Sequence, residues 1–202
     1  MLMRNDLKVV LASASDARRS LLENAGLEFD VLASAVDEAA VREALGHDVA
    51  PIDMAEVLAR AKAEDVAGKS NADVVIAADQ VLAAGDEVFT KAEDMAAARR
   101  QLLALKGRQH QLHSAVVMVV NDAVQFVYTD TADVTMRDYS PEFVGRYLSA
   151  AGPKALESVG CYQLEGPGAQ LIETLEGDFF TVLGLPLFPL LGALRKAGVL
   201  DG

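Results

Sequence analysis

The chain of 202 residues is 51% hydrophobic and carries 18 basic against 30 acidic side chains, a formal net charge of -12. Apolar runs along the whole length exclude a disordered chain and predict a globular protein. So acidic a surface repels polyanions, which argues against a nucleic acid polymer as partner but leaves room for a small anionic ligand held by local basic groups.

The first third of the chain predicts two strands and two helices. The apolar segment 7–12 is typical of a buried strand, and Ser15 caps a helix that ends at Gly26. Residues 29–35 favour a second strand. An apolar stripe at helical spacing, with acidic residues in capping-box positions, predicts a helix over 52–68.

The middle of the chain alternates hairpins and helices. Residues 73–91 predict two strands joined by a turn at Gly85-Asp86, followed by a helix over about 93–106. A second hairpin turns at Asn121-Asp122. The Ser-Pro pair that opens 140–152 is a helix-start signal.

The C-terminal third predicts a strand at "GCYQ", a glycine-rich loop, a strand, a Glu-Gly-Asp turn and a strand at "FFTV". A helix from near Pro186 to Gly198 ends the series. This pattern predicts the α/β class: one elongated domain, residues 1–202, with helices beside a mixed sheet and a cleft.

The stretch "LASASDARRSLL" (11–22) joins a strand to a helix and carries a candidate phosphate cradle. A helix N-terminus presents free N–H groups to an anion. The hydroxyls of Ser13 and Ser15 add donors, and Arg18 and Arg19 add guanidinium forks suited to phosphate. The alternative is that Ser15 is only an N-cap and both arginines lie on a solvated face, since the stretch lacks P-loop glycine spacing.

A second candidate is Asp79, because an ionised carboxylate inside the apolar strand "VVIAADQVL" is costly unless it is paired or binds a metal. The alternative is a strand-end residue that meets solvent or a structural arginine. Gln80 should point to the opposite face unless the strand bulges or ends there. Glu38, in a loop after a strand, could share a divalent cation with Asp79.

The remaining reactive residue types give weaker signals. His47, His110 and His113 lack metal-binding context, and the last two should lie on opposite faces of a strand, so no catalytic role is assigned to them. Cys161 is the one cysteine, which excludes an intrachain disulfide and favours a buried, inert thiol in a reducing compartment. No signal peptide or membrane-spanning run is found, so we expect a cytoplasmic protein with no membrane contact.

Taken together, these segments resemble the Maf family of nucleotide pyrophosphatases, once described as septum-formation inhibitors. The similarity covers nearly the whole chain. Its motifs occur in the family's order: "LASASDARRSLL", "VDE", "AKA", "AADQV", a lysine before a helix, "KGRQHQ", "GCYQLEG" and "GLPL". Each motif alone is weak, but the ordered set is specific.

The resemblance implies two α/β lobes around a deep cleft, as in inosine-triphosphatase-like enzymes, and hydrolysis of a nucleoside triphosphate to the monophosphate and pyrophosphate. It implies a divalent cofactor, and by analogy a homodimer. We expect Mg²⁺ or Mn²⁺, with Glu38 and Asp79 as the metal ligands. Asp79 matches the family's proton acceptor. Polar residues that line the cleft in the family match Ser13, Arg18, Glu38, Lys62 and Lys91.

Three positions that follow base preference in the family hold Ala17, Gln80 and Glu165. Gln80 and Glu165 resemble the subgroup acting on 7-methyl-GTP, whereas Ala17 matches neither this subgroup nor the one acting on dTTP and UTP. Asp16 and Ala92 stand where the family usually has proline. The alternatives are a pyrophosphatase that prefers dTTP or UTP, and a non-catalytic nucleotide-binding regulator of cell division.

Overall fold

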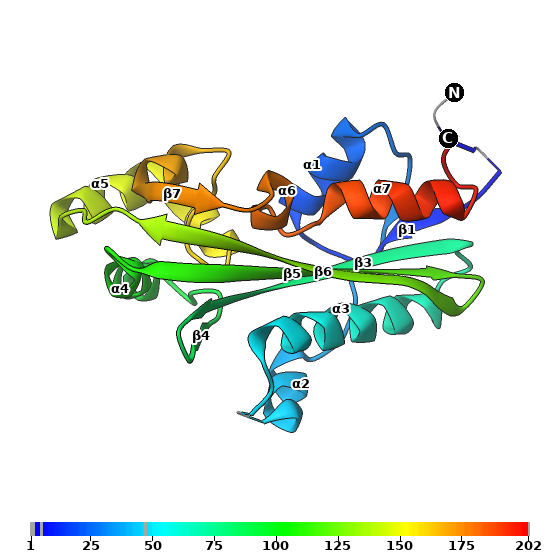
Figure 1. The fold of residues 1–202 in the computed structure, drawn as a ribbon, viewed down its shortest axis with the longest axis horizontal. Coiled ribbons are helices and arrows are strands. Elements are labelled where there is room, and N and C mark those ends of the chain that lie inside the picture. Colours follow the sequence, from blue (N-terminus) through cyan, green and yellow to red (C-terminus); the bar gives the residue numbers. More distant parts are fainter. Residues whose placement is uncertain (1–2, 5, 47, 202) are drawn as a thin grey trace.

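The computed structural model describes residues 3–4, 6–46 and 48–201, which form a seven-stranded mixed sheet with helices on both faces (Figure 1). The strands are β1 (Val9–Leu11), β2 (Asp30–Val31), β3 (Val74–Ala84), β4 (Glu87–Phe89), β5 (Gln109–Val120), β6 (Ala123–Met136) and β7 (Ile172–Glu176). The helices are α1 (Asp16–Asn24), α2 (Glu38–Leu45), α3 (Pro51–Ala67), α4 (Met95–Leu105), α5 (Pro141–Ala151), α6 (Phe179–Val182) and α7 (Leu187–Lys196). Two 3₁₀ segments, Gly152–Glu157 and Pro167–Leu171, lie between α5 and β7.

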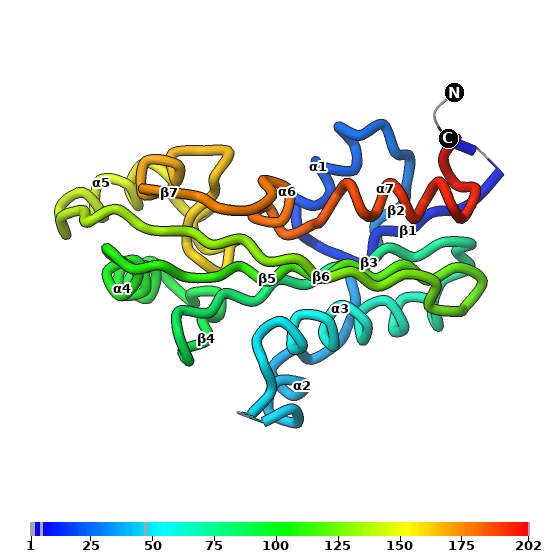
Figure 2. Tube along the Cα trace, viewed as in Figure 1, coloured from blue at the N-terminus to red at the C-terminus, as the bar shows by residue number. Residues whose placement is uncertain are grey.

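The strand order is β2-β1-β3-β5-β6-β7, with β4 paired to the same edge of β3 as β1. The strands β1, β2 and β3 are parallel, and the other pairs are antiparallel. The long strands β3, β5 and β6 form the spine of the elongated molecule, which Figure 2 shows as three nearly coextensive paths. The expected mixed α/β class with flanking helices is thus confirmed.

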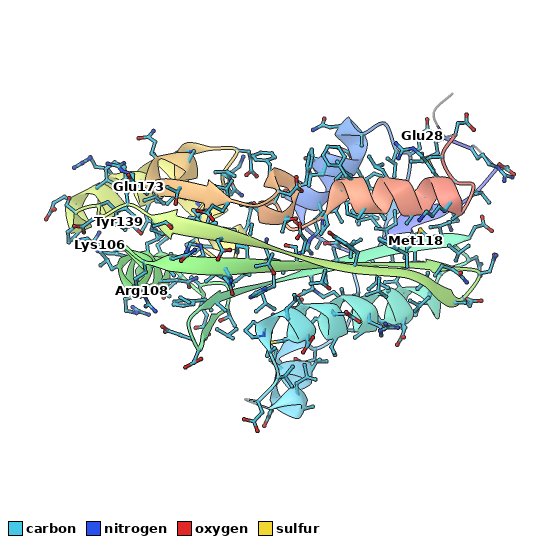
Figure 3. The ribbon with its side chains drawn as sticks, in the orientation of Figure 1. Glu28, Lys106, Arg108, Met118, Tyr139 and Glu173 are labelled. Atoms are coloured by element: carbon cyan, nitrogen blue, oxygen red, sulfur yellow. The ribbon has the colours of Figure 1, made fainter. Side chains whose placement is uncertain are left out.

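Three apolar clusters hold the layers together. One lies between the sheet and α1 and α7, a second between the sheet and α3, and a third at the end near α4 and α5 (Figure 1). Strand β3 contributes to all three, because its successive side chains alternate between faces. Figure 3 marks the two ends: Tyr139 belongs to the cluster beside α4 and α5, and Met118 to the cluster beneath α7.

Most predicted elements are confirmed, including both hairpins and the helices α1, α3, α4, α5 and α7. The strand expected at 29–35 is wrong in length, since only β2 pairs and Leu32 and Ala33, which follow it, are exposed. The acidic loop expected at Glu38 is instead the first turn of α2, capped by the Asp37 carboxylate. None of the described helices combines the length and the apolar character needed to cross a bilayer.

Two predicted strands in the C-terminal third are wrong. The "GCYQ" segment is a tight turn in which Cys161 adopts a φ of 57°, a left-handed conformation that a strand excludes. The "FFTV" segment is the short helix α6, because the Asp178 carboxylate accepts a hydrogen bond from the Thr181 N–H and caps it.

Candidate active site

Strand β3 sends Asp79 and Gln80 to opposite faces of the sheet. The register with β5 is continuous from Val74 to Ala83, so the strand neither bulges nor ends between the two residues. Asp79 therefore points toward α3, and Gln80 points toward α6. The expectation for a regular strand is confirmed, and a ligand that reaches both residues must pass around an edge of the strand.

Such an edge exists, because β3 has an unpaired stretch between its two neighbours. Strand β1 pairs with β3 only as far as Ile76, and β4 pairs only from Leu82 onward. Within the described residues, the intervening edge of β3 accepts a hydrogen bond from a side chain: the Arg18 Nη1 donates to the Ala78 carbonyl at 2.8 Å. The open edge at residues 77–81 is a notch in the sheet.

On the α3 side of the notch, two carboxylates and two basic groups form a compact cluster. The Lys62 Nζ lies 2.5 Å from both Asp79 Oδ1 and Glu38 Oε1. The Arg42 Nη2 lies 3.7 Å from Glu38 Oε2 and 3.8 Å from Asp79 Oδ2. The long helix α3 supplies Lys62, and the first and second turns of α2 supply Glu38 and Arg42.

The Asp79 carboxylate is incompletely satisfied. The residue is 3% exposed, and its buried Oδ2 has no hydrogen-bond partner among the described residues. Partial burial by itself would raise the pKa of Glu38, but the hydrogen bond and charge of Lys62, with the charges of Arg42 and Arg18, outweigh it and lower that pKa. Glu38 is therefore anionic at neutral pH, and Asp79 Oδ2 keeps free lone pairs directed into the cluster.

Arg18 links the cluster to the other side of the notch. Its Nε donates to the Gly184 carbonyl at 2.8 Å, and its Nη1 donates to the Ala78 carbonyl and to the buried Ser13 Oγ at 3.2 Å. Burial lowers the pKa of Arg18, while Asp79 and Glu38 oppose the shift. Ser13 therefore acts within the described structure as an acceptor that orients Arg18, and the Nη2 edge of the guanidinium is left for a ligand.

Lys91 follows β4 and lies at the rim of the notch. It reaches solvent, and the described residues offer it no ion pair. Nearby protein nevertheless removes enough water to lower its pKa, and the charge of Arg18 acts in the same direction while Glu38 opposes it. With Arg18, Arg42 and Lys62, it gives the notch four basic groups against two carboxylates, a local excess of positive charge in an acidic protein.

On the α6 side, the notch opens into a cavity of about 290 Å³. The three expected specificity residues Ala17, Gln80 and Glu165 all line it, together with Arg18 and Lys91. Most of the other lining residues come from the start of α1, from residues 182–183 and from the segment 157–165. We call the segment 157–165 the cavity wall. The structure thus brings these three distant positions to one cavity, and their role in base preference stays a prediction.

Gln80 has a fixed orientation. Its Nε2 lies 3.0 Å from three acceptors: the Ser114 Oγ and the carbonyls of Thr181 and Val182. Because two of these are carbonyls, only the amide nitrogen suits that side, and the carboxamide oxygen is the group left for other contacts. Helix α6 is held in turn by the Thr181 Oγ1, which donates to Asp130 at 2.7 Å.

The carboxylates of the cluster are candidate ligands for a divalent cation. No cluster of three or more His, Cys, Asp or Glu side chains suited to a metal occurs in the described part of the chain. Mg²⁺ typically takes one or two carboxylates and completes its coordination with substrate phosphates and water. Glu38 and the unpartnered Oδ2 of Asp79 fit that pattern.

Sequence reasoning missed Arg42 and Tyr162. Arg42 follows Glu38 by one helical turn, a spacing that becomes visible once Asp37 is read as a helix cap. Tyr162 lines the cavity from a turn that composition alone suggested was a strand.

The fold and the notch define an α/β protein with a basic cleft built for a polyanion. Residues 8–197 match the family model described as "Maf-like protein", and the chain belongs to this family. A relative from Brucella abortus named "7-methyl-GTP pyrophosphatase" is 49% identical, covering 97% of this chain and 99% of the relative. A relative from Granulibacter bethesdensis named "Nucleoside triphosphate pyrophosphatase" is 42% identical over 94% and 97%.

Among solved structures, the Staphylococcus aureus Ham1 protein aligns with 65% of this chain and 72% of its own chain. The alignment has a TM-score of 0.43 and 17% sequence identity. A similarity at this level supports no conclusion about function.

Proposed function

We propose that the protein hydrolyses a nucleoside triphosphate to the monophosphate and pyrophosphate. The observation that carries this proposal is the pairing of a basic, carboxylate-containing cluster with a base-sized cavity across one open edge of β3. The triphosphate would lie in the notch among Arg18, Lys62 and Lys91, with the nucleoside in the cavity. Family membership and the names of the close relatives support the same reaction.

Glu38 and Asp79 would hold the divalent cation that the family implies, Mg²⁺ or Mn²⁺. Bound there with the substrate phosphates, the cation would neutralise phosphate charge and polarise the α-phosphate. Lys62 holds the two carboxylates together, and its hydrogen bond and charge help to lower the pKa of Glu38. Its hydrogen bonds leave Asp79 Oδ2 free for other contacts.

Asp79 would act as the base toward an attacking water. The water oxygen forms a bond to the α-phosphorus, the bond from that phosphorus to the bridging oxygen breaks, and the water proton passes to the carboxylate. Pyrophosphate leaves with the bonding electron pair. Arg18, Arg42, Lys62 and Lys91 would offset the charge that grows on the phosphate oxygens.

The cavity favours a base that presents hydrogen-bond donors and positive charge. Gln80 has only its carboxamide oxygen left for a ligand, and three carboxylates line the cavity: Asp16, Glu157 and Glu165. Guanine presents N1–H and 2-amino donors, and methylation at N7 places a positive charge on the ring. Ala17 offers no stacking surface, so charge and hydrogen bonds replace stacking. We therefore infer 7-methyl-GTP as the preferred substrate.

The two alternatives fit less well. A thymine or uracil ring presents carbonyl acceptors toward the cavity's acceptors, which leaves them unpaired. Nucleotide binding alone does not require a buried carboxylate such as Asp79, whose Oδ2 has no hydrogen-bond partner among the described residues.

A panel of 7-methyl-GTP, GTP, dTTP and UTP with Mg²⁺ or Mn²⁺ tests the proposal, with pyrophosphate and orthophosphate scored separately. We expect pyrophosphate as the primary product and the highest kcat/KM for 7-methyl-GTP, with GTP the matched control for the charge. Primary release of orthophosphate, or no turnover of any member, would contradict the reaction. Equal kcat/KM for 7-methyl-GTP and GTP would contradict the charge argument.

A further inference from the structure

His110 and Tyr162 meet in a buried contact that the hydrolysis itself does not use. They belong to the segments "KGRQHQ" and "GCYQLEG". The His110 Nε2 lies 2.8 Å from the Tyr162 Oη, and the rings pack edge to face with centroids 5.8 Å apart. Both side chains lie almost wholly within the protein, His110 on β5 and Tyr162 on the cavity wall.

Tyr162 connects the cavity wall to the interior. It belongs to the apolar cluster near α4 and α5, and it also lines the cavity that holds Glu165. Its carbonyl accepts a hydrogen bond from the Ser158 Oγ at 2.7 Å. A Cβ at Gly160 would lie 2.4 Å from the Tyr162 ring, so only glycine leaves space for the ring at that point. Ring position and wall backbone are therefore matched.

The wall backbone is held in an uncommon conformation beside this ring. Cys161 has a φ of 57°, and its carbonyl accepts a hydrogen bond from the Tyr147 Oη at 3.0 Å. A left-handed conformation at a residue other than glycine persists only where its surroundings impose it. Here the Tyr147 hydroxyl binds the Cys161 carbonyl, and the neighbouring Tyr162 ring packs beside Gly160.

Tyr162 also supplies the hydrogen bond of His110. The buried Nδ1 of His110 has no partner among the described residues, so Nε2 makes the one polar contact of the ring. Burial lowers the pKa of His110 to about 4, and Arg108 adds to the shift while Asp133 opposes it, so the ring is neutral in the folded protein at neutral pH. Loss of the hydroxyl would leave a buried imidazole with no partner, a state that relaxes by admitting water or moving the wall.

Strand β5 holds both sides of the nucleoside cavity. His110 binds the cavity wall, and Ser114, on the same face of the strand four residues later, contacts Gln80. The spacing between Gln80 and the wall that carries Glu165 is therefore set along one rigid strand.

We propose that His110 and Tyr162 are positioning residues for base recognition: their hydrogen bond fixes the cavity wall, and so Glu165, at the correct distance from Gln80. The proposal rests on the proposed nucleotide hydrolysis. It assigns a role in base selectivity to two residues that lie away from the proposed triphosphate site.

The test is Tyr162→Phe, which keeps the ring and removes the hydroxyl. The matched control is Tyr139→Phe, because Tyr139 is similarly buried in the same cluster and donates to the Leu102 carbonyl at 2.7 Å, but is not among the residues that line the cavity. For each protein, kcat and KM are measured for 7-methyl-GTP and dTTP, with circular dichroism as a check of folding.

We expect Tyr162→Phe to reduce the kcat/KM ratio of 7-methyl-GTP over dTTP roughly fivefold, about the value of one recognition hydrogen bond, through KM more than kcat. Tyr139→Phe should keep the wild-type ratio. A ratio within twofold of wild type for Tyr162→Phe, or an equal fall for Tyr139→Phe, would overturn the proposal.

His110→Phe and the double variant with Tyr162→Phe provide a second measurement. If the two residues act through one hydrogen bond, the double variant should have the same ratio as either single variant. If the changes in the kcat/KM ratio of the two single variants multiply in the double variant, the residues act separately. That result would overturn the proposal that they act as a pair. An inactive wild-type protein would count against the hydrolysis itself, whereas an active wild type with unchanged ratios in the variants would count against the positioning role alone.

Discussion

Lys62 approaches Asp79 to 2.5 Å and at the same time approaches Glu38 to 2.5 Å, so one ammonium holds together two carboxylates from β3 and α2. Without it, the buried Asp79 carboxyl group would face the half-exposed Glu38 carboxylate with no ammonium between them. The contact explains why a helix lysine and a strand aspartate, seventeen positions apart, form one functional unit.

The first prediction concerns this ammonium. Lys62→Met should lower kcat/KM about 100-fold, because the substitution removes an ammonium group that would stabilise the charge on the phosphate oxygens. It should lower the free energy of unfolding by about 3 kcal/mol, since Asp79 remains buried and poorly paired. Lys69→Met, which removes an exposed ion pair with Asp65, is the control and should change neither quantity appreciably. Urea unfolding and steady-state kinetics measure both effects, and equal behaviour of the two variants would contradict the assignment.

The second prediction concerns Arg42. Its contacts of 3.7 and 3.8 Å are looser than those of Lys62. Arg42→Met should therefore lower kcat/KM about tenfold, less than Lys62→Met, with a stability change within about 1 kcal/mol. Arg60→Met removes a similar pair with Glu56 at 3.5 Å on the exposed face of α3 and serves as the control. An unchanged kcat/KM in Arg42→Met would remove Arg42 from the site.

The third prediction concerns pH and Lys91. Because the pKa of this ammonium is lowered, it loses its proton, and with it phosphate affinity, at a lower pH than an ordinary lysine. The alkaline fall of kcat/KM should therefore move to higher pH in Lys91→Arg, since a guanidinium stays protonated. Lys196→Arg, on the exposed end of α7, should leave the profile unchanged. Superimposable alkaline limbs for wild type and Lys91→Arg would contradict a phosphate contact.

The fourth prediction concerns stability in acid. The pKa of His110 is about 4 in the folded state against 6.5 when exposed, so the unfolded chain takes up the proton first as pH falls. The contribution of neutral His110 to the free energy of unfolding is therefore fully present above pH 6.5. It is lost as the pH falls from 6.5 to 4, by about 3 kcal/mol in total.

Urea unfolding of wild type and His110→Phe at pH 7 and pH 4.5 measures this contribution. The wild type should lose more stability than the variant over that interval. The facing charges, Arg108 and Asp133, and the second histidine, His113, are common to both proteins and cancel in the comparison. Parallel losses in the two proteins would show that His110 is not buried as a neutral ring.

Sequence patterns predicted the long elements well and the short ones poorly. The apolar stripe in α3 follows the helical period over many residues, and the long apolar runs of β3 and β5 are typical of buried strands. Each pattern therefore indicates one type of secondary structure. The segments "GCYQ" and "FFTV" are too short to show a period, and local contacts decide their structure: the Tyr162 ring against Gly160, and the Asp178 cap of α6.

The site could be predicted in outline but not in geometry. Motif order brought Arg18, Asp79 and Glu165 to attention, and strand alternation placed Asp79 and Gln80 on opposite faces of β3, but neither showed the open edge that connects the two faces. That edge depends on where β1 ends and β4 begins. Strand β1 ends at Leu11, and Ser15 then caps α1, a helix-start signal that is visible in the sequence but has no visible link to β3.

The most direct test of the central claim is the activity of the Asp79→Asn variant at saturating Mg²⁺. The quantity measured is the rate at which the variant releases pyrophosphate from 7-methyl-GTP. The amide preserves size and an acceptor for Lys62 but cannot take a proton from water. We expect kcat to fall about 1,000-fold, while calorimetry with a non-hydrolysable α,β-methylene nucleotide still shows binding. A kcat within a few-fold of wild type would contradict the role of Asp79 and the mechanism built on it.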